Sequence, residues 1–586
     1  MHTARFLLRL GHASIRSLFT LCLLLGLAQT VAAAPNPCVR YAPGGVVQDP
    51  QDLFSQNGTL TVNLFYNTGT DANGLKLYCF TTADGTESPT LHVNPGDTLI
   101  INVTNNLPAP ASSDDMKVST SADTVCGDTT MNASSVNIHY HGTNTPPTCG
   151  ADEVIHTLIN SGETFTYTVP FPTDEPPGAY WYHPHVHGLS EMAVQGGASG
   201  AIIVDGVENV EPKVAGLPER VFVIRDQPVP ASAMTGDPNL IPAWDISLNY
   251  IPILYPSYQP AVVQMNAREK QFWRVVNASA DTIIDLQLKY DGRVQPLNLE
   301  ALDGVAIGSQ DGTRKGRLQR RGHILLPPAA RAEFVVIGPS AKVKNALLIT
   351  RAVDTGPAGD IDPLRPLASL QVVRAPNAKG TSSTLHRVVI PEVSRAPGPQ
   401  RFEGLADAKV TAKRTLFFSE TSPPDDEEPT FFITVEGATP TAFNPDNPPA
   451  IVTTQGSVED WTIENRSTEA HEFHIHQIHF LLLARNGVPV VASNRNYLDM
   501  VHIPFWRGKG PYPNVKVRLD FRGPDIGDFV YHCHILEHED HGMMAIIRVL
   551  PATASAADKA AALRAVARRI PTPRMCRRVK LINFRR

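Results

Sequence analysis

The segment from His532 to Met543 holds a cysteine among metal-ligand side chains, and it constrains this chain more than any other feature. Cys533, His538 five residues later and Met543 ten residues later supply a soft thiolate, an imidazole and a thioether. With one more histidine from elsewhere, these side chains form the ligand set of a blue-copper centre. His532 and His534 flank the cysteine on a predicted strand, so both imidazoles should point away from Cys533 toward a second site.

Three further histidine clusters argue against a chance arrangement. A cysteine between two histidines is, by itself, more often a buried free thiol among unrelated imidazoles. Three more apolar or aromatic segments carry closely spaced histidines, namely His139 and His141; His183, His185 and His187; and His471, His474 and His476. So many imidazoles, with a thiolate and a thioether, favour copper. Zinc would leave Met543 without a role, and iron in a facial triad requires a carboxylate ligand.

The chain resembles the three-domain multicopper oxidases over roughly residues 45–550, with all four copper motifs in the family's order. This family includes laccases, bilirubin oxidases and bacterial copper or spore-coat oxidases. The resemblance implies four copper ions per chain. The type 1 copper would be held by four side chains, His471, Cys533, His538 and Met543 as the axial ligand. The type 2 copper would be held by His139 and His474. The type 3 pair would be held by the other motif histidines, His141, His183, His185, His476, His532 and His534.

Internal repeats indicate domain duplication independently of the family. The segments Trp273–Ser279 and Trp461–Ser467 share a tryptophan, an asparagine four residues later and a serine six residues later. Offsets of six, nine and eleven residues from Asn465 lead to the three histidines of one cluster. The same offsets from Asn277 lead to apolar residues, Ile283, Leu286 and Leu288. The middle domain is therefore predicted to be copper-free.

The ends of the first and third domains also align. Gly178–His185 parallels Gly527–His534, and Pro184 stands in place of Cys533. The first domain then offers ligands for a trinuclear cluster but no blue-copper site. Two HxH motifs from each of these two domains should meet at their boundary.

The composition fits an all-β chain. The 586 residues include 50 prolines and 41 glycines, with many short β-rich runs and few helix-period segments before residue 556. We expect three cupredoxin-like Greek-key β-sandwich domains at residues 45–208, 213–378 and 385–551. Residues 552–586 form a basic tail with ten Lys or Arg and one acidic residue, for which we expect little fixed structure beyond a short helix at Ala556–Arg568.

The N-terminus is typical of a cleaved Sec-type signal peptide over residues 1–33. Arg5, Arg9 and Arg16 precede the apolar run Leu18–Ala28, which small residues follow. This run is too short to span a bilayer stably. We therefore expect a secreted or periplasmic protein, without an integral membrane span or a nucleic-acid partner, and a monomer.

An oxidising compartment permits disulfides. Cys38, Cys79, Cys126 and Cys149 all belong to the first domain, and four cysteines allow three pairings. We favour Cys38–Cys79 and Cys126–Cys149. Cys576 has no evident partner.

Two carboxylates are candidates for proton delivery. Asp152 lies thirteen residues after His139, where laccases similarly place an aspartate near the cluster, and Glu539 resembles a proton-donating glutamate of bacterial relatives. Reducing dioxygen to water consumes four protons, so acids near the cluster are required. His187, His479 and His541 lie near the motifs, but the ligand count closes without them.

The resemblance implies an oxidase that takes single electrons from a small-molecule reductant and passes them to dioxygen. Phenols or aryl amines are the favoured reductants, because domain three has only Met500, Met543 and Met544 and no methionine-rich insert for Cu(I). The alternative is a metal-ion oxidase for Cu(I), Fe(II) or Mn(II). A periplasmic copper-binding protein without turnover is a third reading, against which the complete ligand set argues. Copper nitrite reductases share the fold but do not need eight cluster histidines.

Overall fold

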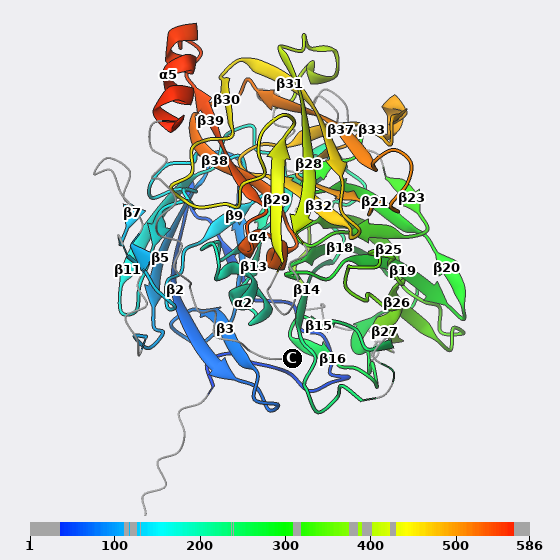
Figure 1. Ribbon diagram of the computed structural model, residues 1–586. Coiled ribbons are helices and arrows are strands. Elements are labelled where there is room, and N and C mark those ends of the chain that lie inside the picture. The colour runs from blue at the N-terminus through cyan, green and yellow to red at the C-terminus, as the bar shows by residue number, and fades with distance from the viewer. Residues whose placement is uncertain are drawn as a thin grey trace, which may run out of the picture. The chain divides into compact units, whose positions relative to one another are not determined.

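The computed structural model describes most of the chain, and the following concerns only residues 36–110, 116–117, 126–128, 130–235, 237, 240–308, 318–373, 385–388, 401–421 and 429–567. The predicted signal peptide and Cys576 lie outside these residues. The fold is all-β, with three cupredoxin-like domains, as the sequence predicts. Figure 1 colours the three successive sets of strands blue to cyan, green, and yellow to orange.

The first set of strands forms two principal sheets. One has, in spatial order, β1 (Asp52–Phe54), β4 (Thr90–Val93), β13 (Gly200–Val204), β12 (Gly178–His183) and β9 (His139–His141). The other has β11 (Thr164–Pro170), β5 (Thr98–Asn105), β2 (Thr59–Thr70) and β3 (Lys76–Thr81). Two small ribbons join β10 (Thr157–Leu158) to β7 (Cys126–Gly127), and β6 (Met116–Lys117) to β8 (Thr130–Met131).

The second set also forms two sheets. The larger contains β16 (Ile251–Ile253), β15 (Trp244–Leu248), β14 (Glu219–Pro228), β18 (Lys270–Asn277), β25 (Arg331–Ile337), β21 (Leu297–Leu302) and β22 (Val305–Ala306), with β23 (Gln319–Arg321) beside β21. The smaller contains β17 (Ala261–Met265), β27 (Arg365–Val372), β26 (Ala346–Thr350), β19 (Ile284–Tyr290) and β20 (Arg293–Gln295), with β24 (Ile324–Leu326) beside β19.

The third set repeats the pattern. One sheet contains β29 (Thr430–Val435), β28 (Ala412–Thr421), β31 (Ser457–Asn465), β37 (Asn514–Phe521), β33 (Phe480–Arg485) and β34 (Val488–Pro489), with β35 (Tyr497–Leu498) beside β33. The other contains β30 (Ile451–Thr454), β39 (Met544–Leu550), β38 (Gly527–Cys533), β32 (His471–Ile475) and β36 (Met500–Ile503).

Alternation of side chains explains why these segments form sandwiches. Strands β5 and β37 bury every second residue, so each has one face toward a core. Two of the cores include the repeated tryptophans, Trp273 and Trp461, which are fully buried. The asparagines of the repeat have the same role in both copies. The Asn277 and Asn465 side-chain amides each donate to one carbonyl of the following loop and to one at the end of a more distant strand, β24 or β36.

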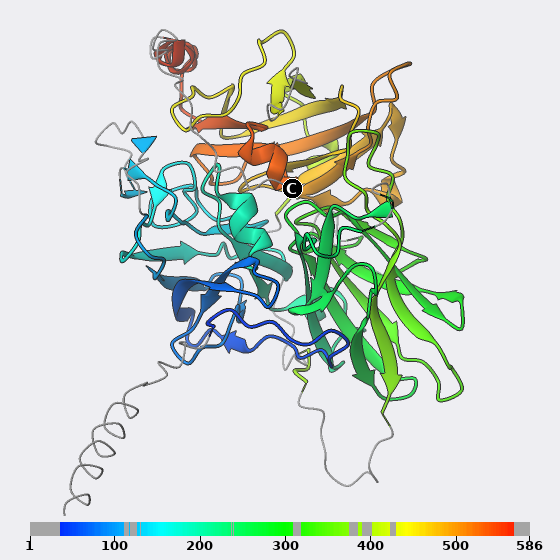
Figure 2. The same cartoon turned by 60° about the horizontal axis from the view of Figure 1, so that its bottom comes forward.

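Helices are short and few among the described residues. They are α2 (Ser190–Gln195), α3 (Val207–Val210), α4 (Leu536–Asp540), α5 (Ala556–Ala567) and the 3-10 turns η2 (Leu405–Asp407) and η3 (Ala492–Asn494). Helices α2 and α4 contact each other across the first and third domains. Helix α5 begins where the sequence predicts a helix in the tail; in the view of Figure 2 it is the red helix. No described helix has the length and apolar composition needed to cross a membrane.

Two disulfides close loops in the first domain. Cys38 is bonded to Cys79, and Cys126 to Cys149, which is the pairing that the sequence favours. Cys533 is the only free cysteine among the described residues, and it is buried. The second disulfide encloses β9, the strand that carries two of the predicted copper ligands.

Candidate copper centres

The predicted type 1 side chains come together at one end of the third domain. Strands β32 and β38 pair antiparallel with Phe473 opposite Cys533, so His471 reaches the cysteine from the neighbouring strand. The Cys533 Sγ lies 3.6 Å from the His471 Nδ1 and 3.7 Å from the Nδ1 of His538, which helix α4 contributes. The two Nδ1 atoms are 3.0 Å apart. A thiolate and two imidazoles at these separations can share one metal ion.

Met543 and Met544 face different cores. Met543 is fully buried in the same apolar cluster as Cys533. Met544 begins β39 and packs in a separate cluster with Val530 and Ile546. Of the two methionines, only Met543 therefore shares a cluster with Cys533, and its role as a ligand stays a prediction.

Eight predicted cluster histidines meet where the first and third domains touch. In each domain, strand pairing brings two histidine motifs side by side, with His139 opposite His183 and His474 opposite His532. Contacts between the domains join these pairs: the His139 and His476 rings stack with centroids 3.8 Å apart, and His141 and His474 with centroids 4.0 Å apart. The other cluster histidines pack within the same group, namely His183, His185, His532 and His534.

The donor set of this cluster fits bound copper. Seven ring nitrogens of the cluster are buried without a hydrogen-bond partner among the described residues, namely one each of His139, His141, His183, His474 and His476, and both of His534. Burial lowers the pKa values of these histidines, so their rings are neutral and carry lone pairs. So many buried lone pairs facing one another would be costly unless cations bind them.

Cys533 connects the two centres through the peptide backbone. It lies between His532 and His534, whose rings belong to the cluster, while its own sulfur faces His471 and His538. The backbone N–H of Glu472 donates to the sulfur at 3.3 Å. Burial raises the pKa of the Cys533 thiol well above its usual value, so a bound cation is what would stabilise the thiolate here.

Asp152 contacts one of the predicted type 2 ligands. Its Oδ1 accepts hydrogen bonds from the His139 Nδ1 at 2.9 Å and from the Tyr140 backbone at 3.0 Å. The Gln477 side-chain amide donates to the other oxygen. These bonds leave the His139 Nε2 facing the cluster.

Glu539 touches two histidines of the predicted type 3 pair. Its Oε2 lies 3.1 Å from the His532 Nδ1, and its Oε1 lies 3.6 Å from the His185 Nδ1. The carboxylate is fully buried, yet the neighbouring imidazoles hold its pKa low, at about 2, against the effect of burial. Helix α4 positions both Glu539 and the type 1 candidate His538.

The structure adds contacts to the predicted ligands, and one of the contacting residues, Asp499, carried no signal in the sequence. Ser467 lies 2.7 Å from the His471 Nε2, and Asp499 lies 3.3 Å from the His141 Nε2. Asp499 is remote in the sequence from every histidine motif, and only the fold brings its carboxylate close to His141. His479 bonds the Asp303 carbonyl, His541 bonds the Glu537 carbonyl, and His187 packs edge-on against Phe443.

The two predicted type 1 histidines are both buried. His471 has no solvent contact, whereas His538 is 5% exposed and keeps a small solvent contact, so of the two rings it lies nearer the surface. Glu469 Oε2 lies 3.5 Å from the His538 Nε2, and Glu420 is hydrogen-bonded to Glu469. Phe431 stacks on the His538 ring with centroids 4.2 Å apart.

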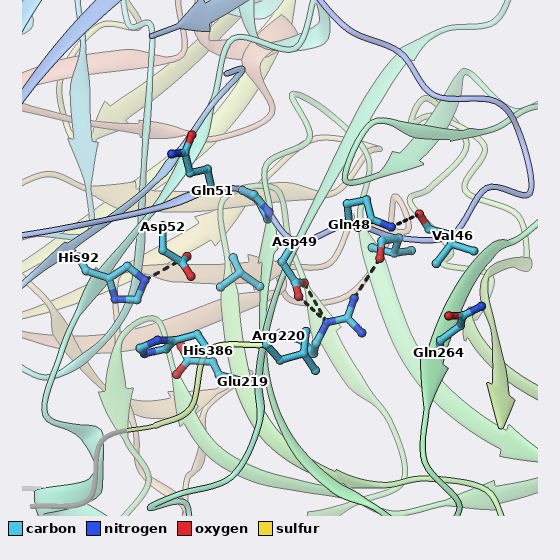
Figure 3. Close-up of a pocket in the computed structure, with 14 residues that line it drawn as sticks. Val46, Gln48, Asp49, Gln51, Asp52, His92, Glu219, Arg220, Gln264 and His386 are labelled. Atoms are coloured by element: carbon cyan, nitrogen blue, oxygen red, sulfur yellow. Dashed lines mark hydrogen bonds and ion pairs between the residues drawn. The ribbon is translucent and has the colours of Figure 1, made fainter. Parts of the chain in front are cut away.

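A separate pocket of ≈ 460 Å³ includes none of the predicted ligands (Figure 3). His92 lies at its wall, and both of its ring nitrogens already contact carboxylates, those of Asp52 and Asp205. Arg220 pairs with Asp49 across the same pocket. His386 also lines this pocket, which lies apart from the two histidine centres.

Comparison with known proteins identifies relatives of one kind. Two profiles described as multicopper oxidase match residues 124–209 and 419–553. The multicopper oxidase mco of Staphylococcus haemolyticus is 23% identical over 394 residues, which cover 65% of this chain and 70% of that protein. The laccase of Bacillus subtilis is 22% identical over 397 residues, covering 64% and 71%.

Solved structures share the fold. A multicopper oxidase from Campylobacter jejuni, described as a metallo-oxidase, has a TM-score of 0.61 and 21% identity, with 87% of this chain and 96% of that chain covered. A laccase-like enzyme from Ochrobactrum, described as active towards lignin model compounds and lignosulfonate, has a TM-score of 0.57 and 19% identity, with 86% and 100% covered.

Proposed function

This chain is a member of the multicopper oxidase family and an oxidoreductase that acts with dioxygen, and we propose that it oxidises phenolic or aryl substrates one electron at a time and reduces dioxygen to water. The observation that carries this proposal is Cys533, which faces two imidazoles while its neighbours His532 and His534 face a second histidine cluster. A mononuclear site and a polynuclear site separated by one residue are suited to electron transfer over a short bonded path.

We assign four copper ions to the chain. His471, Cys533 and His538 would hold the type 1 ion with Met543 as axial ligand, and His139 and His474 would hold the type 2 ion. The six remaining cluster histidines would hold the type 3 pair, namely His141, His183, His185, His476, His532 and His534. The unpartnered ring nitrogens support this assignment.

Bound copper would supply the one-electron oxidation of the reductant and the four-electron reduction of dioxygen. The chain supplies the rest. Of the two type 1 imidazoles, that of His538 lies nearer the surface and would accept the electron from a reductant, because Ser467 and the core cover His471. The burial of the cluster histidines excludes bulk water from the second site.

Asp152 and Glu539 are proposed to deliver protons to the cluster. Asp152 acts beside the Nδ1 of His139, and Glu539 lies between the Nδ1 atoms of His185 and His532. Both carboxyl groups are buried among cluster ligands. Burial raises the pKa of Asp152 well above its usual value, so Asp152 can hold a proton, whereas Glu539, with a pKa of about 2, is ionised and would accept a proton and pass it on. We also propose that the protein acts outside the cytoplasm, as the N-terminal sequence indicates.

The test is oxygen uptake by the copper-loaded protein with a panel of phenols, bilirubin, Cu(I), Fe(II) and Mn(II). A dimethoxyphenol should be oxidised with four electrons taken per dioxygen, without free peroxide, and without strong activation by added Cu(II). A fully copper-loaded protein that takes up no oxygen with any reductant would instead be a copper-binding protein without turnover.

Metal-ion oxidation is the second candidate, and one observation favours it. The carboxyl groups of Glu420 and Glu469 lie together beside the His538 Nε2, where a hard cation such as Fe(II) or Mn(II) would find oxygen ligands next to the electron-accepting edge. Phe431, which stacks on the same ring, is buried and makes the inner side of this site apolar.

One pair of variants separates the two candidates. Glu469→Gln should lower kcat/KM for Fe(II) or Mn(II) about tenfold or more if cations bind there, and should leave phenol oxidation within about twofold. Glu436→Gln removes a half-exposed carboxylate that pairs with Arg466 and serves as the matched control. A wild-type preference for Cu(I), Fe(II) or Mn(II) over the phenol would establish the metal-oxidase function.

A further inference from the structure

A buried ion pair joins the copper-free middle domain to the histidine cluster. Arg331 begins β25 and donates to Asp499 through two nitrogens, with Nη1 2.7 Å from Oδ1 and Nη2 against Oδ2. The Arg331 Nε also donates to the Ala179 carbonyl of β12 at 3.1 Å. Both charged side chains are fully buried. One guanidinium therefore contacts all three domains.

Asp499 contacts two predicted ligands through different nitrogens. Its Oδ1 lies 3.3 Å from the His141 Nε2, and its backbone carbonyl lies 2.9 Å from the His474 Nδ1. The opposite nitrogens, His141 Nδ1 and His474 Nε2, are buried without a partner among the described residues. Because a neutral imidazole has one N–H, a bond accepted from one nitrogen leaves the lone pair on the other.

We propose that Asp499, held by Arg331, is a positioning residue that fixes which nitrogen of His141 and of His474 faces copper. The copper-free middle domain thus takes part in building the trinuclear cluster. This inference rests on the proposed function, because it assumes that these two histidines are copper ligands.

A third residue holds Asp499 in place. The Asp303 Oδ2 accepts hydrogen bonds from the backbone N–H groups of Asp499 and Met500, at 3.3 and 3.2 Å. Its Oδ1 accepts the Arg331 backbone N–H at 3.0 Å. Both the backbone and the side chain of Asp499 are therefore fixed by the middle domain.

The turn after His141 is built around this ion pair. Gly142 has a φ of +83°, and a Cβ there would lie 2.2 Å from the Arg331 Nη2 and 2.5 Å from the Asp499 Oδ2. A side chain at this position would displace the pair. Because Gly142 has no side chain, the Arg331–Asp499 ion pair packs directly against the strand that carries His141.

Stability alone is a weak reason for burying these charges, because the loss of hydration offsets much of the attraction in a buried ion pair. The middle domain also buries Arg274, which pairs with Glu219 and Glu333 and has no cluster histidine among its partners. The Arg274–Glu219 ion pair therefore provides a control of similar burial in the same domain.

The experiment compares Asp499→Asn with Glu219→Gln in the copper-loaded protein. Asp499→Asn keeps the backbone bond to His474 but removes the charge that accepts from His141. It should weaken binding of trinuclear copper by about 10- to 100-fold and change the type 2 signal in electron paramagnetic resonance (EPR) spectra, while the type 1 absorption band persists. Glu219→Gln should leave the type 2 signal and the copper count unchanged.

Arg331→Lys gives a second test, because lysine keeps the charge without the two-pronged contact. Arg331→Lys should shift the type 2 EPR signal in the same direction as Asp499→Asn does. If Asp499→Asn does not fold, Arg331→Lys alone tests the inference. A type 2 signal and copper affinity unchanged in the folded variants would overturn the inference, as would equal copper loss in Glu219→Gln. A wild-type protein that binds copper without a type 2 signal would instead contradict the proposed ligand assignment.

Discussion

At the scale of single residues, several predicted histidine ligands have a partner that fixes the ring. The Ser467 hydroxyl contacts the His471 Nε2, which leaves the Nδ1 toward Cys533. The equivalent Ser279 of the middle domain has a buried hydroxyl without a partner among the described residues, since the position of the histidine is taken by Ile283. The repeat thus keeps its serine in both copies, but only one copy has a ring for it to orient.

Cys533→Ser should abolish the type 1 absorption band and substrate oxidation while leaving copper at the second cluster. Only Cys533 supplies a thiolate, whereas eight histidines surround the other site. The measured copper content should fall from about four to about three ions per chain. Loss of all copper from a folded variant would contradict the two-site assignment.

Met543→Leu should raise the type 1 reduction potential and keep the absorption band. A thioether donates weakly to copper, and its removal destabilises the oxidised ion more than the reduced one. Met544→Leu is the matched control, because Met544 packs in a different cluster from Cys533. Redox titration checks this, and a shift seen only in the Met544 variant would mean that the axial ligand is the neighbouring residue.

At the scale of elements, strand pairing does most of the positioning. Strands β9 and β12 bring together the histidines of the first domain, and β32 and β38 those of the third. Strand β9 is only three residues long and lies inside the loop closed by Cys126–Cys149. The disulfide therefore restrains the segment that presents His139 and His141.

Replacing Cys126 and Cys149 by serine should lower the free energy of unfolding by about 3 kcal/mol, because the reduced loop gains freedom in the unfolded chain. It should also weaken type 2 copper binding. The matched double variant of Cys38 and Cys79 should cost similar stability without that effect, since its loop holds none of the predicted ligands. Denaturant titration and copper-affinity measurements check both parts, and equal copper affinities in the two variants would contradict the second.

At the scale of the whole molecule, the packed structure buries carboxyl groups as well as histidines. Asp362 accepts a hydrogen bond from the Ile283 backbone through one oxygen, and its other oxygen lies 3.7 Å from the Arg365 Nη2. The pKa of Asp362 is raised to about 8, chiefly by burial. The nearby Asp360 and Asp226 also raise this pKa, and Arg365 lowers it. The folded protein thus binds a proton there more tightly than the unfolded chain does.

The stabilising contribution of the Asp362 proton is complete below the unfolded pKa of about 4 and is lost as pH rises through about 8. Asp362→Asn imitates the protonated form. It should therefore be more stable than the wild type at pH 8 and similar at pH 4. Thermal unfolding of the two proteins across this range isolates Asp362 from other groups that titrate there, and parallel curves would contradict the raised pKa.

The sequence by itself determined the all-β class, the copper motifs and the apolar middle repeat, because histidine spacing on strands and the Trp–Asn–Ser repeat are local patterns. The domain boundaries and the ligand roles remain predictions. Only the tertiary structure brought Asp499 and Arg331 to the cluster and placed His538 nearer to solvent than His471. These features come from residues that are distant in the chain, and their proximity depends on how three sandwiches pack, which no local pattern encodes.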